Sequence, residues 1–275
     1  MASIRDWVTG ARVRTLPLAV APVFLGSALA ASIDRFDFTL ATLALLVALL
    51  LQIGVNYAND YSDGIRGTDT GRVGPLRLTA SGLALPEDVK RAAFITFGLA
   101  MLAVCVLAAW YYTGGNSPYG YSGLGEVAVF IFFGLVATVG TNFVQTGFID
   151  PLAVLLGSSL GLYASAVLLV NNIRDLETDR ASGKRTLAVK LGEKPSKTLF
   201  LLLLWLPVLI NLLLVLIYPA TLLGMLNLLL LLPVTLIIME SKNPGELITA
   251  LKLTSLAGLG YGVLVGLGVF LVSFF

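Results

Sequence analysis

The sequence predicts an all-α fold, a polytopic bundle of transmembrane helices. Of the 275 residues, 57% are hydrophobic and only 12% are charged, and the mean hydropathy is +0.91. Ordinary soluble domains do not reach these values. Long charge-free runs recur along the chain and are apolar on every face. The strands of a membrane barrel would instead alternate apolar and polar residues.

Eight of these runs contain 19 to 23 residues. Each is long enough to cross a hydrocarbon core of about 30 Å as a helix. They are 15–33, 38–57, 92–113, 127–148, 152–170, 198–217, 220–239 and 253–275. The first run follows Arg5, Arg12 and Arg14 without a small-residue cleavage pattern, so we expect a retained span and not a signal peptide. We expect one integral membrane domain over residues 1–275.

Charged residues are concentrated in two loops between the spans. Residues 58–91 hold ten and residues 171–197 hold eleven, together 21 of the chain's 34. Because Lys and Arg are enriched in cytoplasmic loops, we expect both loops and the N-terminus to face the cytoplasm at the plasma membrane. Topology alone explains the basic residues. It does not explain the nine carboxylates beside them, since acidic residues contribute little to orientation.

Each loop opens with an amide that is followed by carboxylates at helical spacing. The two sets are Asn56, Asp60 and Asp63 in the first loop and Asn171, Asp175 and Asp179 in the second. If the preceding helices continue, each set lies on one helical face, where like charges repel unless a cation compensates them. Oxygen ligands of this kind suit Mg²⁺. The chain has no histidine and only one cysteine, Cys105, which removes imidazole ligands and cysteine metal motifs.

Two such clusters facing each other would hold magnesium ions with a diphosphate between them. Basic side chains in the same loops could then bind phosphate oxygens. They are Arg66, Arg72, Arg77, Arg174, Lys184 and Arg185. The adjoining apolar bundle implies a ligand with a lipid tail, and a polyprenyl diphosphate meets both requirements.

Four stretches of the chain carry a resemblance to a known family. They are ARVRTLPLAVAPV (11–23), NYANDYSDGIRGTDTGRVGPLRLTASG (56–82), YTGGNSPYGYSGLGEVAVFIFFGLVATVGT (112–141) and LLVNNIRDLETDRASGKRTLAVKLG (168–192). These stretches resemble the UbiA superfamily of intramembrane aromatic prenyltransferases. Among its branches, they are most similar to the one that prenylates 1,4-dihydroxy-2-naphthoate for menaquinone synthesis.

The resemblance implies a set of site residues and a reaction. The implied Mg²⁺ ligands, which are also the catalytic residues, are Asp60, Asp63, Asp175 and Asp179. The implied diphosphate-binding residues are Asn56, Arg66, Arg72, Arg77, Asn172, Arg174 and Lys184. In the implied reaction, metal ions draw off diphosphate and leave an allylic cation, which attacks the naphthoate ring with loss of CO₂ and gives demethylmenaquinone. A dry pocket would protect the cation from water.

Several other polar residues have two explanations each. Asp69 fits a metal shell or a turn with Gly67. Arg12 and Arg14 fit acceptor binding, or orientation at the membrane surface. Glu126 fits substrate contact, but a helix N-terminus explains it more simply. An interfacial aromatic belt or an aromatic-lined cation path would account for Tyr111, Tyr112, Tyr119 and Tyr121.

The span count conflicts with the family, whose members have nine spans and both Asp-rich loops on the cytoplasmic side. Three predicted spans lie between the two loops, and an odd number would place the loops on opposite faces of the membrane. We therefore expect that residues 88–113 do not cross as one simple helix. A span lost near Ala100 from a shortened sequence is the favoured explanation; a broken re-entrant pair or a non-standard topology are the others.

Other classes of membrane protein share some of these features. A prenyltransferase with another acceptor, such as 4-hydroxybenzoate, has the same motifs. A cation-coupled transporter would also use membrane carboxylates, but here they gather at one surface and not at the midplane. The compact D-x-x-D-G-x-x-A-R motif of CDP-alcohol phosphotransferases is missing. The expected partners are a polyprenyl diphosphate, an aromatic acceptor and the lipid bilayer, and nothing suggests nucleic acid.

Overall fold

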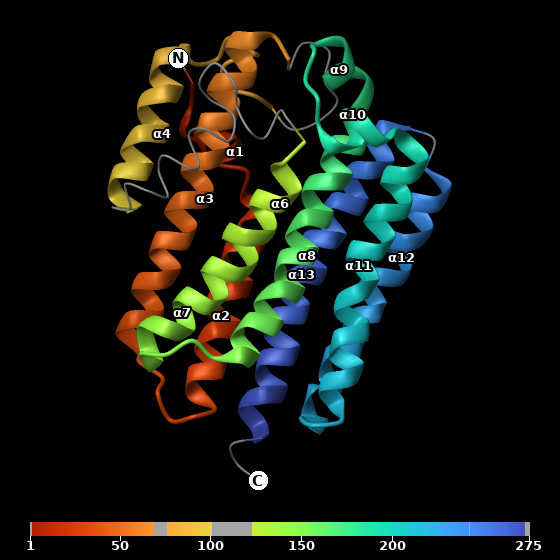
Figure 1. Ribbon diagram of the computed structural model, residues 1–275. Helices are drawn as coiled ribbons and strands as arrows, with labels where there is room; N and C mark the ends of the chain where they lie inside the picture. Colours follow the sequence, from red (N-terminus) through yellow and green to blue (C-terminus); the bar gives the residue numbers. More distant parts are fainter. Residues whose placement is uncertain (1, 69–75, 101–122, 242, 273–275) are drawn as a thin grey trace.

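The computed structural model describes residues 2–68, 76–100, 123–241 and 243–272. Within these ranges the regular structure is helical (Figure 1). The helices are α1 (Ile4–Gly10), the 3₁₀ helix η1 (Val13–Thr15), α2 (Pro17–Ala31), α3 (Phe38–Arg66), α4 (Pro86–Ala100), α6 (Gly125–Val129), the π-helix η3 (Phe130–Val136), α7 (Ala137–Thr146), α8 (Pro151–Arg174), α9 (Leu176–Ala181), α10 (Leu187–Leu191), α11 (Glu193–Val215), the 3₁₀ helix η4 (Pro219–Asn227), α12 (Leu228–Glu240) and α13 (Pro244–Val272).

The described helices confirm a multi-pass membrane protein. Six elements are long and apolar enough to cross a membrane, and a seventh crossing arises if the bent pair Ile4–Thr15 and Pro17–Ala31 forms one span. The six are α3, α6–η3–α7, α8, α11, η4–α12 and α13. These seven segments match seven of the eight predicted spans. The other predicted span, 92–113, falls largely outside the described residues, as does the question of how residues 88–113 cross.

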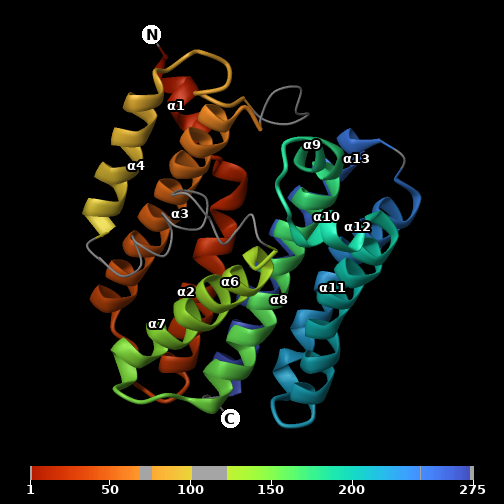
Figure 2. The same ribbon diagram turned by 45° about the horizontal axis from the view of Figure 1, so that its top comes forward.

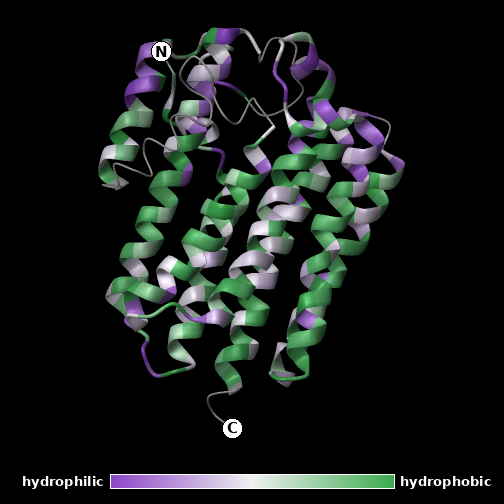
Figure 3. Cartoon of the chain, viewed as in Figure 1, coloured by the Kyte–Doolittle hydropathy of each residue, from purple (hydrophilic) through white to green (hydrophobic). Residues whose placement is uncertain are grey.

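Hydropathy divides the bundle along its length. Hydrophilic residues gather mainly at the end that carries the N-terminus, α4 and α9, and the helices below this end are mostly hydrophobic (Figure 3). The C-terminal ends of α3 and α8 lie at the same end (Figure 1). When this end is turned forward, α1, α3 and α4 lie on one side and α8 to α13 on the other (Figure 2). Both Asp-rich motifs therefore reach one surface.

Helix α3 carries the first motif because it continues beyond the charge-free run. Its N-terminus is capped by Asp37, whose side chain accepts a hydrogen bond from the Leu40 amide at 2.8 Å. Its C-terminus is set by Gly67, which takes the left-handed conformation at φ 71° that glycine adopts without steric cost. Asn56 through Asp63 are thus held on a regular helix, as the sequence predicted.

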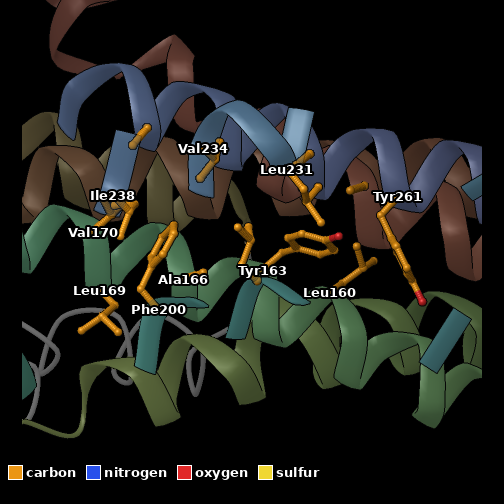
Figure 4. Packing of buried hydrophobic residues seen from close by; sticks show 14 of the residues in the cluster. Leu160, Tyr163, Ala166, Leu169, Val170, Phe200, Leu231, Val234, Ile238 and Tyr261 are labelled. Atoms are coloured by element: carbon orange, nitrogen blue, oxygen red, sulfur yellow. The ribbon is translucent and has the colours of Figure 1, made fainter. Parts of the chain in front are cut away.

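Helix α8 is the central element of the core. It packs against α11, α13 and η3, and most of its residues are buried. Tyr163 of α8 lies beside Tyr261 of α13, with ring centroids 5.5 Å apart, and next to Leu231 of α12 (Figure 4). The Asn227 amide donates to the Tyr163 hydroxyl at 3.1 Å and to the Ala257 carbonyl at 2.9 Å. These bonds pair polar atoms that membrane hydrocarbon would leave unsatisfied.

The π-helix η3 crosses α8 at a contact between glycines. A Cβ atom built on Gly134 would lie 2.4 Å from the Gly161 Cα and 2.5 Å from the Gly157 carbonyl oxygen. No side chain fits at that distance. Small residues allow membrane helices to approach closely where lipid supplies no hydrophobic force between them. The close approach fixes the wall that η3 contributes to the cavity described next.

Candidate active site

A cavity of about 570 Å³ lies between α2, α3, the α6–η3–α7 span and α8. Its deeper walls are apolar and include Leu43 and Val47 of α3, Phe132 and Val136 of η3, and Val144 of α7. Polar side chains line the part near the hydrophilic end. They are Arg12, Thr15, Gln52, Asn56, Asn59, Asp63, Arg77, Asn171, Asn172 and Lys184. The cavity therefore joins a polar head-group region to an apolar chamber.

Two residues of the first predicted cluster, Asn56 and Asp63, face this cavity from α3. The third, Asp60, does not line it. Its Oδ2 accepts a hydrogen bond from the Leu78 amide and its Oδ1 one from the Thr79 amide, both at 2.9 Å. The Asp60 side chain is fully buried. Asp60 thereby holds the segment that contains Leu78 and Thr79 against α3. This contact positions Arg77, the residue before Leu78.

The second predicted cluster lies across a one-residue break between two helices. Helix α8 ends at Arg174 and α9 begins at Leu176, with Asp175 at the joint. The Arg174 guanidinium donates to both oxygens of Asp175 at 2.7 Å through Nε and Nη2. The same Nη2 also donates to Asn171 Oδ1 at 2.9 Å. The backbone keeps the predicted i, i+4 spacing across this break, because the Asp175 amide donates to the Asn171 carbonyl at 3.1 Å and the Asp179 amide donates to the Asp175 carbonyl at 2.8 Å.

The two motifs nevertheless meet through Lys184. Its Nζ lies 3.6 Å from Asp179 Oδ1 and 4.0 Å from Asp63 Oδ1. On the other side of Asp63, Arg77 Nη2 lies 3.8 Å from Oδ2. All four side chains are largely buried, so their charges interact with less screening than at an open surface. Two carboxylates and two cations thus form one compact cluster at the rim of the cavity.

The remaining predicted site residues lie in different places. Asn172 lines the cavity, and its amide donates to Glu126 Oε1 at 2.9 Å. Arg66 and Arg185 are exposed and do not line it. Arg174 is buried beside Asp175. The predicted residues outside the described part of the chain are Asp69, Arg72 and the tyrosines Tyr111, Tyr112, Tyr119 and Tyr121.

The cavity also contains polar residues that the sequence reasoning missed. Asn59 lines it, and its Oδ1 is buried with no hydrogen-bond partner among the described residues. The sequence feature that could have indicated Asn59 is its position next to Asp60 in the same motif. Gln52 and Thr15 line the cavity as well. Gln52 could have been noticed as an amide one helical turn before Asn56, inside a run that is otherwise almost entirely apolar.

The residues at the cluster fit a hard divalent cation. Asp63 and Asp179 supply only oxygen ligands, and both lie within 4.0 Å of the same ammonium group. Mg²⁺ commonly uses one or two carboxylates, several waters and substrate phosphate oxygens. In the described ranges, no group of three His, Cys, Asp or Glu residues is placed to hold a metal. A metal bound here would therefore depend on water and phosphate ligands.

Fold and site together define a multi-pass membrane protein with a charged cluster above an apolar cavity. A family model described as the UbiA prenyltransferase family matches residues 19–256. The chain belongs to this family. This confirms the resemblance that the four sequence stretches indicated.

Named relatives agree with this placement. The 1,4-dihydroxy-2-naphthoate octaprenyltransferase of Mycobacterium tuberculosis is 42% identical, with 96% of this chain and 97% of the relative covered. The Mycobacterium leprae protein of the same name is 49% identical over 74% of this chain and 75% of the relative. A solved UbiA homolog from Archaeoglobus fulgidus, bound to GPP and Mg²⁺, has a TM-score of 0.68 at 14% identity, covering 94% and 99% of the two chains. That likeness shows the fold.

Proposed function

We propose that this chain transfers a polyprenyl group from its diphosphate to 1,4-dihydroxy-2-naphthoate, with loss of CO₂. The observation that carries the proposal is the meeting of Asp63, Asp179 and Lys184 above an apolar cavity. It is supported by 42% identity along almost the whole chain to a relative with that activity in its name. The direct product of these bond changes is demethylmenaquinol, the hydroquinone, and its two-electron oxidation to demethylmenaquinone is a separate later step.

Mg²⁺ is the proposed metal, and Asp63 and Asp179 are its proposed ligands. Bound there, the metal would act as a Lewis acid on the leaving diphosphate. Arg77 and Lys184 neutralise charge on the phosphate oxygens, as cations close to a developing anion do. Asp60 and Asp175, the other two proposed ligands, already accept hydrogen bonds at both carboxylate oxygens, so a metal would have to share these oxygens with their present donors or displace the donors.

The bond changes of this reaction balance without a further reactant. The bond between the allylic carbon and the diphosphate oxygen breaks, and its electron pair leaves with diphosphate. The ring carbon that bears the carboxylate forms the new bond, and CO₂ departs, returning its electron pair to the ring. The apolar walls at Phe132, Val136 and Val144 surround the prenyl chain and exclude water from the cation.

The proposed location is the plasma membrane, with the charged cluster on the cytoplasmic side. Both Asp-rich motifs and the Arg-bearing N-terminus lie at the same end of the bundle (Figure 1). Lys and Arg are enriched in the cytoplasmic segments of membrane proteins. A soluble diphosphate leaving group would then be released into the cytoplasm.

The test is prenyl transfer by the purified protein in detergent, with a polyprenyl diphosphate, 1,4-dihydroxy-2-naphthoate and Mg²⁺. We expect a lipid-soluble product that disappears with a chelator. Asp63→Asn and Asp179→Asn should each lower the rate at least about 100-fold, because each removes a charge at the reacting diphosphate. Glu177→Gln is the control, since Glu177 is an exposed acid on the same helix as Asp179. Product with 4-hydroxybenzoate alone would move the chain to another branch of the family.

A further inference from the structure

A second polar group lies in the cavity, separate from the Asp63 cluster, and it is built around the Thr15 hydroxyl. This hydroxyl donates to the Arg12 carbonyl oxygen at 2.9 Å. It accepts hydrogen bonds from Gln52 Nε2 and Asn56 Nδ2, each at 3.1 Å. Arg12, Thr15, Gln52 and Asn56 all line the cavity. We call these four residues the Thr15 group.

The hydrogen bonds of Thr15 fix the orientation of both amides. A hydroxyl has one proton, and here the Arg12 carbonyl accepts it. Gln52 and Asn56 can therefore reach Thr15 only as donors, through their amide nitrogens. Gln52 is 6% exposed, and its Oε1 is buried without a hydrogen-bond partner among the described residues. A buried acceptor in this state costs free energy unless a ligand supplies a donor.

Arg12 supplies the complementary chemistry at the same place. Its Nη2 is buried and has no hydrogen-bond partner in the described part of the chain. Its backbone lies in the left-handed region at φ 52° and ψ 61°, which is strained for a residue other than glycine. Arg12 lies between α1 and η1, shortly before the 51° bend that separates Ile4–Thr15 from Pro17–Ala31. Backbone strain of this kind persists at positions that hold a functional side chain in place.

A cation and an amide oxygen, both unsatisfied in one cavity wall, fit a ligand that presents an anion beside a hydroxyl group. We propose that Arg12 binds the carboxylate of the aromatic acceptor and that Gln52 Oε1 accepts the proton of the adjacent ring hydroxyl. The inference rests on the proposed function and adds the residues that select the acceptor. In 1,4-dihydroxy-2-naphthoate a hydroxyl is next to the carboxylate, whereas in 4-hydroxybenzoate it is across the ring.

The position along α3 suits this assignment. Gln52 and Asp63 are eleven residues apart, which corresponds to about 16 Å of rise along a helix. This separation leaves room for a diphosphate at the Asp63 cluster and for the two fused rings of a naphthoate at the Thr15 group. The proposal requires the ring carbon that bears the carboxylate to face the allylic carbon. Arg12 and Gln52 act as specificity-determining residues for the acceptor.

The fate of the carboxylate determines which kinetic constant should change when Arg12 is replaced. It is anionic in the bound acceptor and leaves as neutral CO₂, so its attraction to Arg12 is strongest before the reaction. An interaction that is not stronger in the transition state contributes to KM and does not raise kcat. Loss of Arg12 should therefore appear mainly in the KM for the acceptor.

The experiment measures initial rates of Arg12→Gln, Arg12→Lys and Gln52→Leu against each substrate separately. We expect Arg12→Gln to raise the acceptor KM about 10- to 100-fold, as for a lost charged hydrogen bond, with the KM for prenyl diphosphate within about two-fold. The matched control is Arg14→Gln, because Arg14 is exposed and does not line the cavity. An increase in the KM for prenyl diphosphate instead, or an unchanged acceptor KM, would overturn the inference.

A second measurement changes the ligand and leaves the protein intact. 1-Hydroxy-2-naphthoate and 2-naphthoate are compared as probes by quenching of protein fluorescence in the absence of prenyl diphosphate. In the wild type we expect the probe without the hydroxyl to bind several-fold more weakly, and in Gln52→Leu we expect equal affinities. Equal affinities in the wild type would overturn the inference even if prenyl transfer occurs. If the binding pattern holds but no prenyl transfer is found, the proposed function fails and the subsite remains.

Discussion

Two aspartates of one motif show how neighbouring residues of the same type acquire different roles. Asp63 faces the cavity and lies near Arg77 and Lys184. Asp60, three residues earlier, is buried against the amides of Leu78 and Thr79. Side chains three residues apart on a helix lie on adjacent parts of its surface, so a small rotation about the helix axis separates a carboxylate bonded to backbone amides from one that faces the cavity.

Asp60→Asn should therefore act through stability. The amide keeps one acceptor but turns an NH₂ group toward the second backbone N–H, and a buried hydrogen bond to a charged group is lost. We expect the free energy of unfolding to fall by about 1.5–3 kcal/mol. Thermal unfolding in detergent, followed by tryptophan fluorescence, measures the change.

Asp63→Asn is the matched comparison, since it removes the same charge from the cavity side of the same helix. It should abolish most prenyl transfer, whereas its melting temperature should fall less than that of Asp60→Asn, because the contacts of Asp63 to Arg77 and Lys184 are long, at 3.8 and 4.0 Å. If Asp60→Asn melts like the wild type and loses only metal-dependent activity, Asp60 is a metal ligand and not a brace.

The sequence predicted the positions of the individual site residues only in part. The spacing of Asn56 and Asp63 follows the helical period, and both face the cavity. The same spacing could not place Asp60, because its partners Leu78 and Thr79 come from a segment that returns to α3 through tertiary folding. It also could not show that Arg174 holds Asp175, since that contact depends on where α8 ends.

At the scale of elements, the span Gly125–Thr146 shows what hydropathy leaves undetermined. The charge-free run 127–148 predicted a membrane helix, and one is present. Apolar composition carries no signal for its π-helical part, η3, which lies against α8 where Gly134 meets Gly157 and Gly161. A π-helix shifts the register of the side chains that follow it, and such segments often occur at functional sites. Here Phe132 and Val136 of η3 form part of the cavity wall.

Gly134→Ala should separate η3 from α8. The added methyl group would lie 2.4 Å from the Gly161 Cα, so the two backbones must move apart. Overpacking of this kind costs about 1–3 kcal/mol. The control is Gly140→Ala in the same span, because a Cβ there would meet nothing within 4 Å. Equal melting temperatures for the two variants would show that the glycine contact does not determine helix spacing.

At the scale of the whole molecule, the arrangement of crossings decides whether the two motifs can form one site. Counting charge-free runs gave three crossings between the motifs, which would separate them. The structure brings Asp63 and Asp179 to the same lysine. Hydropathy could not resolve this, because a charge-free run shows that a segment is apolar but not whether it crosses once. The positive-inside pattern was the better guide, since it placed both loops on one side.

Cysteine accessibility tests this arrangement in cells. Cys105→Ser removes the native cysteine, and single cysteines replace exposed residues at the two ends of the bundle. Arg91→Cys and Arg180→Cys report on the end with the motifs, and both side chains are more than half exposed. Arg35→Cys and Ile149→Cys report on the opposite end, where Gln145 Oε1 accepts a hydrogen bond from the Asp37 amide and joins the two loops.

A membrane-impermeant maleimide should label the Arg91 and Arg180 variants in inside-out vesicles and leave them unlabelled in intact cells. The Arg35 and Ile149 variants should show the reverse pattern. The two reporters of each pair must agree, because each pair lies at one end of a single bundle. Labelling of the Arg91 and Arg180 variants from opposite sides would place the two motifs across the membrane from each other. The Lys184 contact could not then exist in the cell, and the proposed diphosphate site would have to be abandoned.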